Sequence, residues 1–165
     1  MEIDHLKTPW KTTQNQKWRF VTDAVMGGLS TGKVDIHKID GQNCYQMTGN
    51  VSTKNNGGFI QIRTEIIPNL KISDFEGIYL KIYGNNASYG IHIRTEFTLA
   101  PWQYYSNYFK SPNQWITIKL PFEKFNKSNF YQPKILKSQK IKSIGLVAGF
   151  KDYKANICLS EIGFY

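Results

Sequence analysis

The strict alternation of apolar and polar residues over short segments most constrains the fold of this chain. In residues 77–84 (GIYLKIYG), Ile78, Leu80 and Ile82 alternate with more polar side chains. Successive side chains of a strand point to opposite faces, so this pattern indicates one buried face. Strand patterns are recognisable in ten segments: 16–21, 33–39, 44–52, 59–67, 77–84, 89–97, 102–109, 114–120, 141–150 and 156–164.

Turn residues separate these segments, and helical periodicity is almost absent. The turns are marked by Gly27-Gly28, Asp40-Gly41, Asn55–Gly58, Gly84–Asn86 and Pro112-Asn113. Only 121–126 and 134–140 are helix candidates, and neither keeps an amphipathic face. Many short strands joined by turns predict an all-β fold, a two-sheet antiparallel β-sandwich or jelly roll. We expect helix below about 10%, against the usual third.

A chain of 165 residues corresponds to one ordinary domain. The polar residues 1–15 predict a loose N-terminal arm, and 16–165 the single domain. Hydrophobic residues make up 41% of the chain, enough for a core without a disulfide or a metal. Cys44 and Cys158 lie far apart in strand-like segments, and we predict that both are buried free thiols.

The N-terminal residues predict a cytoplasmic protein. The opening Met-Glu-Ile-Asp-His-Leu lacks the basic start and apolar stretch of a signal peptide. It is acidic where a mitochondrial transit peptide is Arg-rich. No apolar run reaches the roughly 18 residues that would span a bilayer.

The net charge of +9 is concentrated in the last third of the chain. Residues 110–165 carry 10 lysines against Glu123, Asp152 and Glu161. Such a stretch marks either an anionic partner or a solvated face. Lysine lacks the bidentate fork of arginine, which favours the solvated face. We predict no specific nucleic-acid binding, and peripheral membrane contact through this region stays open.

No motif of catalysis or nucleotide binding is complete. Residues 27–34 come within one residue of a phosphate-binding loop, but Val34 replaces the magnesium-binding Ser or Thr. The residues that follow alternate like a strand, whereas the loop must open a helix. We therefore predict no nucleotide binding, no cofactor and no catalytic residues, and an enzyme without a recognisable motif stays open as a third alternative. For metals, the cysteines and histidines share no ligand spacing, and Glu161 is the one weak candidate for a structural calcium ligand.

A repeated pattern, Ile-x-Ile-Arg-Thr-Glu, occurs at residues 60–65 and 91–96. Period-two geometry places the isoleucines in the core and puts Arg63, His92 and Arg94 on the outer face. The outward side chains form either cross-strand ion pairs with Glu65 and Glu96 or the polar floor of a groove. Both interpretations remain open from the sequence.

Other candidate ligand contacts come from turns and aromatic residues. The glycine turns either are simply tight turns or bring Asp23, Asn55 and Asn56 to one rim as contacts. Trp102, followed closely by Tyr104, is the best candidate for an exposed stacking platform. Trp18 and Trp115 lie among strand apolar residues and are predicted to be core.

Several segments in sequence order resemble the complex I intermediate-associated protein 30 family. They are WRFVTDAVMGGLS (18–30), GNVSTKNNGGFIQIR (49–63), YGIHIR (89–94), WQYY (102–105), WITIKLPFEKF (115–125) and ICLSEIGFY (157–165). Two features depart from the family pattern: Ala24 replaces a glycine, and 126–139 replaces an Arg-Gly segment.

The resemblance implies a galactose-binding-like jelly roll. It also implies a non-enzymatic, protein-binding role, such as that of an assembly factor or chaperone for respiratory complex I (NADH:ubiquinone oxidoreductase). The alternative is a carbohydrate-binding module, because this fold is shared by many of them and fold alone does not give function. In that case Arg63, Arg94 and His92 would form the groove floor, with Trp102 and Tyr104 as its wall.

Overall fold

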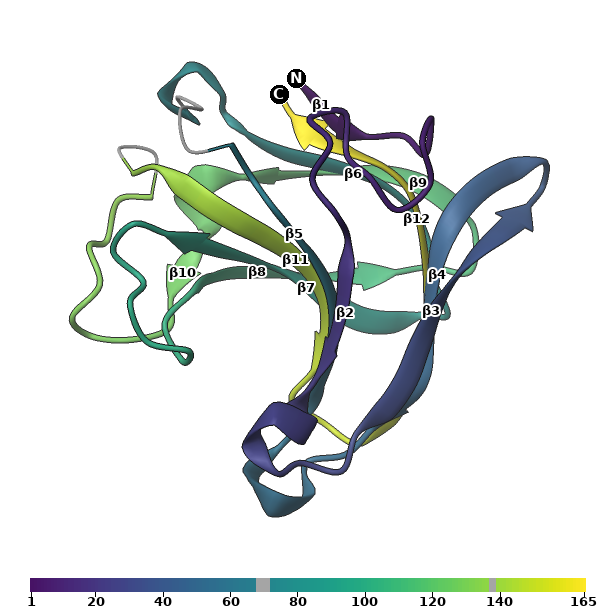
Figure 1. The fold of residues 1–165 in the computed structure, drawn as a ribbon, viewed down its shortest axis with the longest axis horizontal. Coiled ribbons are helices and arrows are strands. Elements are labelled where there is room, and N and C mark those ends of the chain that lie inside the picture. Colours follow the sequence, from purple (N-terminus) through teal and green to yellow (C-terminus); the bar gives the residue numbers. More distant parts are fainter. Residues whose placement is uncertain (68–71, 137–138) are drawn as a thin grey trace.

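The computed structural model describes residues 1–67, 72–136 and 139–165, and shows two antiparallel sheets packed face to face (Figure 1). The first sheet has the order β3-β4-β12-β6-β9, with β1 beside β12, and the second the order β10-β8-β7-β11-β5-β2. Strands of the first sheet are β1 (Glu2–Asp4), β3 (Thr31–Ile39), β4 (Gln42–Val51), β6 (Gly77–Tyr83), β9 (Trp115–Pro121) and β12 (Tyr153–Phe164). Strands of the second are β2 (Arg19–Thr22), β5 (Phe59–Glu65), β7 (Ala87–Thr95), β8 (Tyr105–Ser111), β10 (Asn126–Lys127) and β11 (Ile141–Gly149).

The predicted all-β sandwich is confirmed, with 55% strand and 8% helix. In the described ranges the helical turns are short 3-10 segments: η1 (Asp23–Met26), η2 (Lys54–Asn56), η3 (Ile72–Asp74) and η4 (Phe122–Lys124). Of the two helix candidates, 121–126 contains η4, whereas the described residues of 134–140 hold no helix. None of the described helices is long and apolar enough to cross a membrane.

Alternation along the strands builds the core between the sheets. Ile60 and Ile62 of β5 and Ile91 and Ile93 of β7 are fully buried. Their outward neighbours are only partly buried, as the repeated pattern predicts. The two copies lie in one sheet, on either side of β11, because both β5 and β7 pair with that strand.

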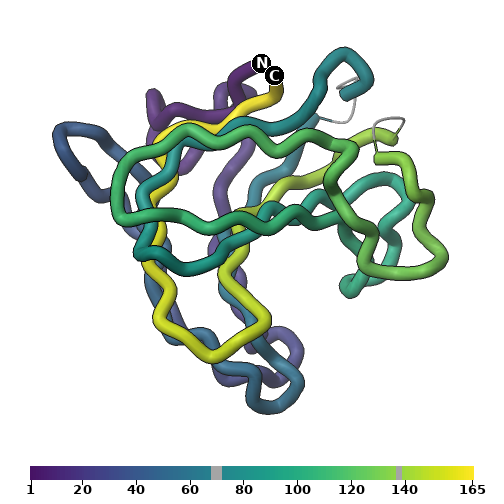
Figure 2. The backbone as a smooth tube through the Cα atoms, turned by 180° about the vertical axis from the view of Figure 1, so that it is seen from behind, coloured from purple at the N-terminus to yellow at the C-terminus, as the bar shows by residue number. Residues whose placement is uncertain are grey.

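The N-terminal segment is part of the domain, and the prediction of a loose arm is wrong. Strand β1 pairs with β12, and Figure 2 shows the two ends of the chain side by side. The buried Asp4 carboxylate accepts hydrogen bonds from the Trp18 indole N–H at 2.6 Å and the Tyr45 hydroxyl at 2.7 Å. A buried carboxylate must be satisfied in this way, since an unpaired one is costly. Trp18 is therefore core, as predicted.

The prediction of free thiols is also wrong. Cys44 in β4 and Cys158 in β12 form a disulfide with an S–S distance of 2.02 Å. Both are buried, as predicted. Their strands are neighbours in the first sheet, which brings residues 114 positions apart in sequence to a Cα–Cα distance of 5.4 Å. That proximity depends on strand order, which composition and spacing do not reveal.

Candidate ligand-binding face

The outer face of the second sheet has small residues in its middle and long side chains beside them. The central strand β11 presents Ser143 and Gly145. Gly145 lies opposite Arg63 of β5 on one side and His92 of β7 on the other. A Cβ added to Gly145 would come within 2.8 Å of the Gln61 side chain, so the flanking side chains crowd over this position. This face thus collects the outward residues of both copies of the repeated pattern.

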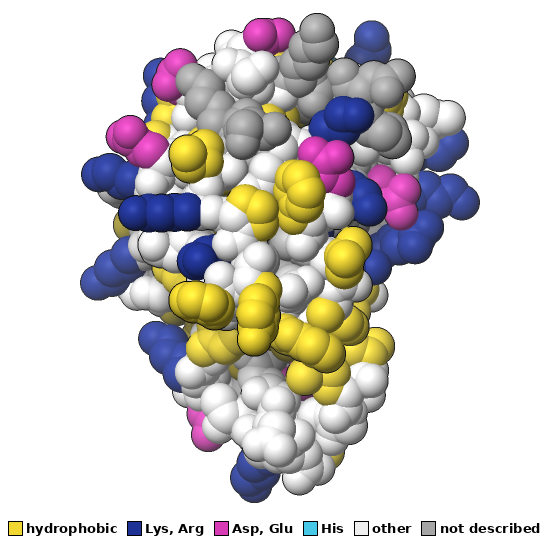
Figure 3. All heavy atoms as spheres, turned by 90° about the vertical axis from the view of Figure 1, so that its left-hand side faces the viewer, with side chains coloured by type: hydrophobic (Ala, Val, Ile, Leu, Met, Phe, Trp, Pro, Cys, Tyr) yellow, Lys and Arg dark blue, Asp and Glu magenta, His cyan; other side chains and the backbone are white. Residues whose placement is uncertain are grey.

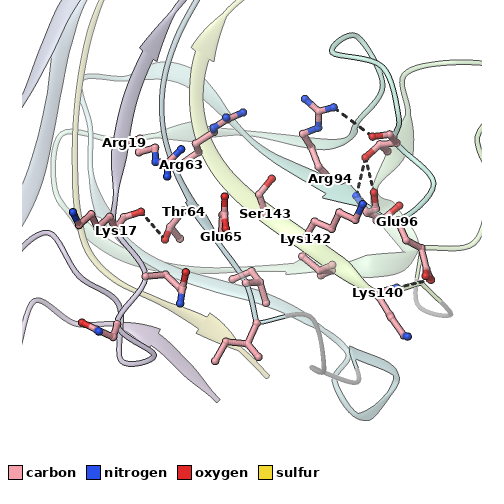
Figure 4. A pocket seen from close by; sticks show the side chains of 17 residues that line it. Lys17, Arg19, Arg63, Thr64, Glu65, Arg94, Glu96, Lys140, Lys142 and Ser143 are labelled. Carbon is pink, nitrogen blue, oxygen red and sulfur yellow. Dashed lines mark hydrogen bonds between the residues drawn. The ribbon is translucent and has the colours of Figure 1, made fainter.

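One end of this face holds a pocket of about 860 Å³. Figure 4 shows that its lining comes from the ends of β5, β7 and β11 and from the segment before β2. Basic side chains outnumber acidic ones in this lining. The acidic residues are Glu65 and Glu96, and the six basic residues are Lys17, Arg19, Arg63, Arg94, Lys140 and Lys142. We call this the basic pocket.

Two arginines of the basic pocket, Arg63 and Arg94, have different roles. Arg94 donates hydrogen bonds to the carbonyl oxygens of Ala100 at 3.0 Å and Thr98 at 3.4 Å. Burial, and then the charge of Arg63, lower the pKa of Arg94 from its usual value. Arg63 is partly buried, and its guanidinium has no hydrogen bond or ion pair within the described part of the chain.

Cross-strand ion pairing does not explain these arginines. Among the described residues the ion pairs are His5–Glu2 and Lys33–Asp35, both away from this pocket. A Glu96 carboxylate oxygen instead accepts the backbone N–H of Lys140 at 3.2 Å. Ion pairing of Arg63 or Arg94 with Glu65 or Glu96, one of the two interpretations left open by the sequence, is thus not seen among the described residues.

An aromatic cluster adjoins the basic pocket along β7 and β8. The His92 ring stacks on Tyr104, with centroids 4.0 Å apart, and more loosely on Phe150 at 5.9 Å. Its Nε2 is 3.0 Å from the Tyr108 hydroxyl. Tyr108 in turn lies over Gly90, where an added Cβ would come within 2.5 Å of its ring. Burial lowers the pKa of His92 to about 4, so the imidazole is neutral at pH 7.

The predicted turn contacts are not brought to this face. Asp23 is fully buried, and its carboxylate accepts hydrogen bonds from Ser30 (backbone N–H and hydroxyl) and from the backbone N–H groups of Gly58 and Phe59. Burial raises the pKa of Asp23, but these hydrogen bonds outweigh it, so the pKa lies below its usual value. Asp23 thus ties the two glycine turns together and cannot meet a ligand there.

Asn55 and Asn56 are exposed but remote from the basic pocket. They belong to η2, before the first residue of β5, whereas the pocket lies at the last residues of that strand. The amide of Asn55 donates to the Gly27 carbonyl at 3.3 Å, which joins the two turns. In Figure 1 these turns form the lower tip of the molecule. The structure therefore separates them from Arg63 and Arg94.

The match to a family model extends over nearly the whole chain. The model for complex I intermediate-associated protein 30 matches residues 8–159. The chain belongs to this family. No curated protein matches it.

Solved structures similar to this chain include carbohydrate-binding modules and an exo-beta-agarase. The family 11 carbohydrate-binding module of cellulosomal cellulase Lic26A-Cel5E of Clostridium thermocellum is 14% identical, with a TM-score of 0.73, over 99% of this chain and 92% of that one. An exo-beta-agarase has a TM-score of 0.60 at 9% identity, over 99% of this chain but 25% of the enzyme. At these identities the likeness shows the fold alone.

The segment 126–139, which departs from the family pattern, is tied to the aromatic cluster. The Ser128 hydroxyl accepts the Tyr104 backbone N–H at 2.9 Å and donates to the Trp102 carbonyl at 2.7 Å. Trp102 itself is 65% exposed, as its predicted platform role requires. Trp115, predicted to be core, instead lies half-buried, stacked edge-on against Tyr83 in the first sheet.

Sequence reasoning missed several residues of this face. Arg19 lies opposite Arg63, in the strand that pairs with β5. Both strands were predicted from the sequence, so pairing segment 16–21 with segment 59–67 would have found Arg19. Tyr108 shares the period-two face of Tyr104. Phe150 follows the end of β11 with a positive φ of 69°, and no local pattern announces that conformation.

The weak metal candidate, Glu161, has another partner. Its carboxylate accepts the Tyr79 hydroxyl at 2.9 Å. Within the described ranges, no group of three or more His, Cys, Asp or Glu side chains is placed to hold a metal ion.

Proposed function

We propose that this protein is a non-enzymatic binding domain that uses the basic pocket and the adjoining aromatic cluster to hold a partner protein. The family supports an assembly role, since its name refers to intermediates of complex I. The observation that carries the proposal is Arg63, a partly buried guanidinium with no partner among the described residues. A carboxylate of the ligand would give this guanidinium a hydrogen-bonding partner.

The charge balance of the pocket identifies the ligand chemistry. Six basic side chains face two acidic ones, so the pocket attracts an anion. Guanidinium groups bind carboxylates through two parallel hydrogen bonds, which fixes the geometry of the bound group. An acidic segment of a polypeptide meets this requirement, and a neutral glucan does not.

Capture of partners from native lysate by the wild type and by Arg63→Ala tests this proposal. Loss of a charge-assisted hydrogen bond should weaken binding by about 1–3 kcal/mol, because the partner's carboxylate is left unpaired. The melting temperature should change little, since the Arg63 side chain makes no hydrogen bond or ion pair in the described part of the chain. Lys33→Ala, which removes an exposed lysine on the other sheet, is the matched control. Equal capture by wild type and Arg63→Ala contradicts the proposal.

Glycan binding is the second candidate, and the aromatic cluster favours it. The stacked His92 and Tyr104 rings resemble the platforms on which sugar rings lie. The solved relatives of the fold include a module in complex with a beta-1,3-1,4-mixed-linked tetrasaccharide. Binding on a glycan array that is lost in Tyr104→Ala, but kept in Arg63→Ala, would favour this candidate over a protein partner.

We further propose that the protein works in an oxidising compartment. The cytoplasm expected from the N-terminal residues would keep Cys44 and Cys158 as thiols, whereas the structure joins them. Cell fractionation, with thiol labelling of the protein in each fraction, tests this. Recovery in the cytoplasm with both thiols reduced would overturn it.

A further inference from the structure

Two loops next to the second sheet expose large hydrophobic side chains. One loop, 97–103, joins β7 to β8, and the other, 128–136, follows β10. Figures 1 and 2 both show them side by side. Their exposed side chains, with accessible fractions between 49% and 86%, are Phe97, Leu99, Trp102, Phe130, Tyr131 and Ile135. Figure 3 looks onto this side of the molecule, where hydrophobic side chains gather across the surface. We call these two loops the loop platform.

The loops are held to each other by polar side chains, one buried and one exposed. Gln132 is buried and donates to the Tyr104 carbonyl at 2.9 Å. Ser128 bridges the loops through the Trp102 carbonyl, and its backbone N–H donates to the Tyr104 carbonyl at 2.9 Å. Such a network fixes the position of both loops, so the hydrophobic side chains are exposed on an ordered framework and cannot collapse onto the core.

Several backbone groups of the first loop are hydrogen-bonded to side chains of the protein. The Gln103 side-chain oxygen accepts the backbone N–H groups of Leu99 at 2.9 Å and Ala100 at 3.0 Å. Arg94 donates to the carbonyls of Thr98 and Ala100. These groups therefore need no water when the loop enters an apolar environment.

The second loop is satisfied in the same way. The Lys127 ammonium donates to the carbonyls of Phe130 at 3.0 Å and Gln132 at 3.3 Å. The buried Gln139 amide donates to the Ile135 carbonyl at 2.8 Å. Several main-chain carbonyls beneath the exposed side chains are thus already hydrogen-bonded within the protein.

Charge around the loop platform favours an anionic surface. The chain carries a net charge of +9, and the second loop lies in its lysine-rich part, residues 110–165. Lys127 and Lys134 are exposed within or beside the second loop. A second copy of the chain would place like charges against each other in a two-fold contact. Aromatic and aliphatic side chains mixed with lysines are typical of segments that lie in the interface of an anionic membrane.

We propose that the loop platform docks this protein on the surface of an anionic lipid bilayer. The side chains of Leu99, Trp102, Phe130 and Tyr131 enter the headgroup region, and the lysines contact lipid phosphates. This goes beyond the proposed binding function, because it uses a surface separate from the partner contact of Arg63.

Co-sedimentation with vesicles tests the proposal. The wild type should bind vesicles of phosphatidylcholine mixed with phosphatidylserine, and bind phosphatidylcholine alone far more weakly. The double variant Phe130→Ser/Tyr131→Ser should lose at least about tenfold in affinity, since it removes two large exposed apolar side chains from the contact. Both residues are more than 80% exposed, so the fold should be kept.

Matched variants separate this proposal from others. Val25→Ser/Leu29→Ser removes exposed apolar side chains from the glycine-turn tip and should bind vesicles like the wild type. Arg63→Ala should also bind like the wild type, even where it loses its protein partner. No sedimentation of the wild type with anionic vesicles overturns the proposal, as does an equal loss in Val25→Ser/Leu29→Ser. A wild-type dimer that Phe130→Ser/Tyr131→Ser converts to a monomer would assign the loop platform to self-association instead.

Discussion

At the scale of single residues, Asp23 looks like part of a binding site in the sequence, but in the structure its role is to hold the fold together. Asp23 shortly precedes Gly27 and Gly28, and Asn55 shortly precedes a second glycine pair, which is the composition expected of a ligand rim. Its carboxylate is consumed by four internal hydrogen bonds, and a Cβ on Gly28 or Gly57 would come within about 2.5 Å of it. The glycines are therefore required by the buried carboxylate and need no external ligand to explain them.

Asp23→Asn should destabilise the domain strongly. The amide NH₂ would face the N–H of Gly58, where the carboxylate oxygen now accepts a hydrogen bond at 2.5 Å. We expect a loss of about 2–4 kcal/mol in the free energy of unfolding, as for a buried polar group left without its partners. Urea denaturation measures it. Asp35→Asn, at an exposed position, should change stability by less than about 0.5 kcal/mol. Equal effects of the two substitutions would contradict the structural role.

His92 should make stability depend on pH. Its pKa of about 4 in the fold lies below the 6.5 of an unperturbed histidine, so the unfolded chain binds more protons between these values. The free energy of unfolding should therefore fall as pH drops from about 6.5 to 4, by at most about 3 kcal/mol. Denaturation of His92→Gln across this range should show a smaller fall, and the exposed His37→Gln should follow the wild type. Parallel curves for His92→Gln and wild type would contradict this.

At the scale of elements, the disulfide joins strands that the sequence separates widely. Removing it with Cys44→Ser/Cys158→Ser should lower the free energy of unfolding by about 2–5 kcal/mol, because the cross-link restrains a long loop of the unfolded chain. Labelling of the denatured protein should find no thiol before reduction and two after it. Two labelled thiols before reduction would restore the original prediction of free cysteines.

Sequence patterns predicted the individual strands better than they predicted which strands lie next to each other in a sheet. Alternation placed Ile60 inside and Arg63 outside correctly, since that depends only on the geometry of one strand. The insertion of β11 between β5 and β7, which brings Arg63 and Arg94 to one pocket, depends on strand order. The same limit hid the pairing of Cys44 with Cys158. The polar segment 1–15 was misjudged because one buried carboxylate, Asp4, anchors it.

At the scale of the whole molecule, Arg94 connects the basic pocket with the loop platform. Its guanidinium lines the pocket beside Arg63 and also holds the Thr98 and Ala100 carbonyls of the first loop. Loss of the Arg63 side chain removes only the hydrogen bonds that it would make to a ligand. Loss of Arg94 also leaves two loop carbonyls without their donor, so the two surfaces should respond together.

Arg94→Ala should therefore weaken both partner capture and binding to anionic vesicles, whereas Arg63→Ala weakens capture alone and Phe130→Ser/Tyr131→Ser weakens vesicle binding alone. The vesicle effect of Arg94→Ala should be several-fold, because it disorders the framework and leaves the hydrophobic side chains present. Hydrogen exchange should show faster exchange in 97–103 for Arg94→Ala and unchanged exchange there for Arg63→Ala. Vesicle binding by Arg94→Ala at the wild-type level, with unchanged exchange in this loop, would show that the two surfaces are independent.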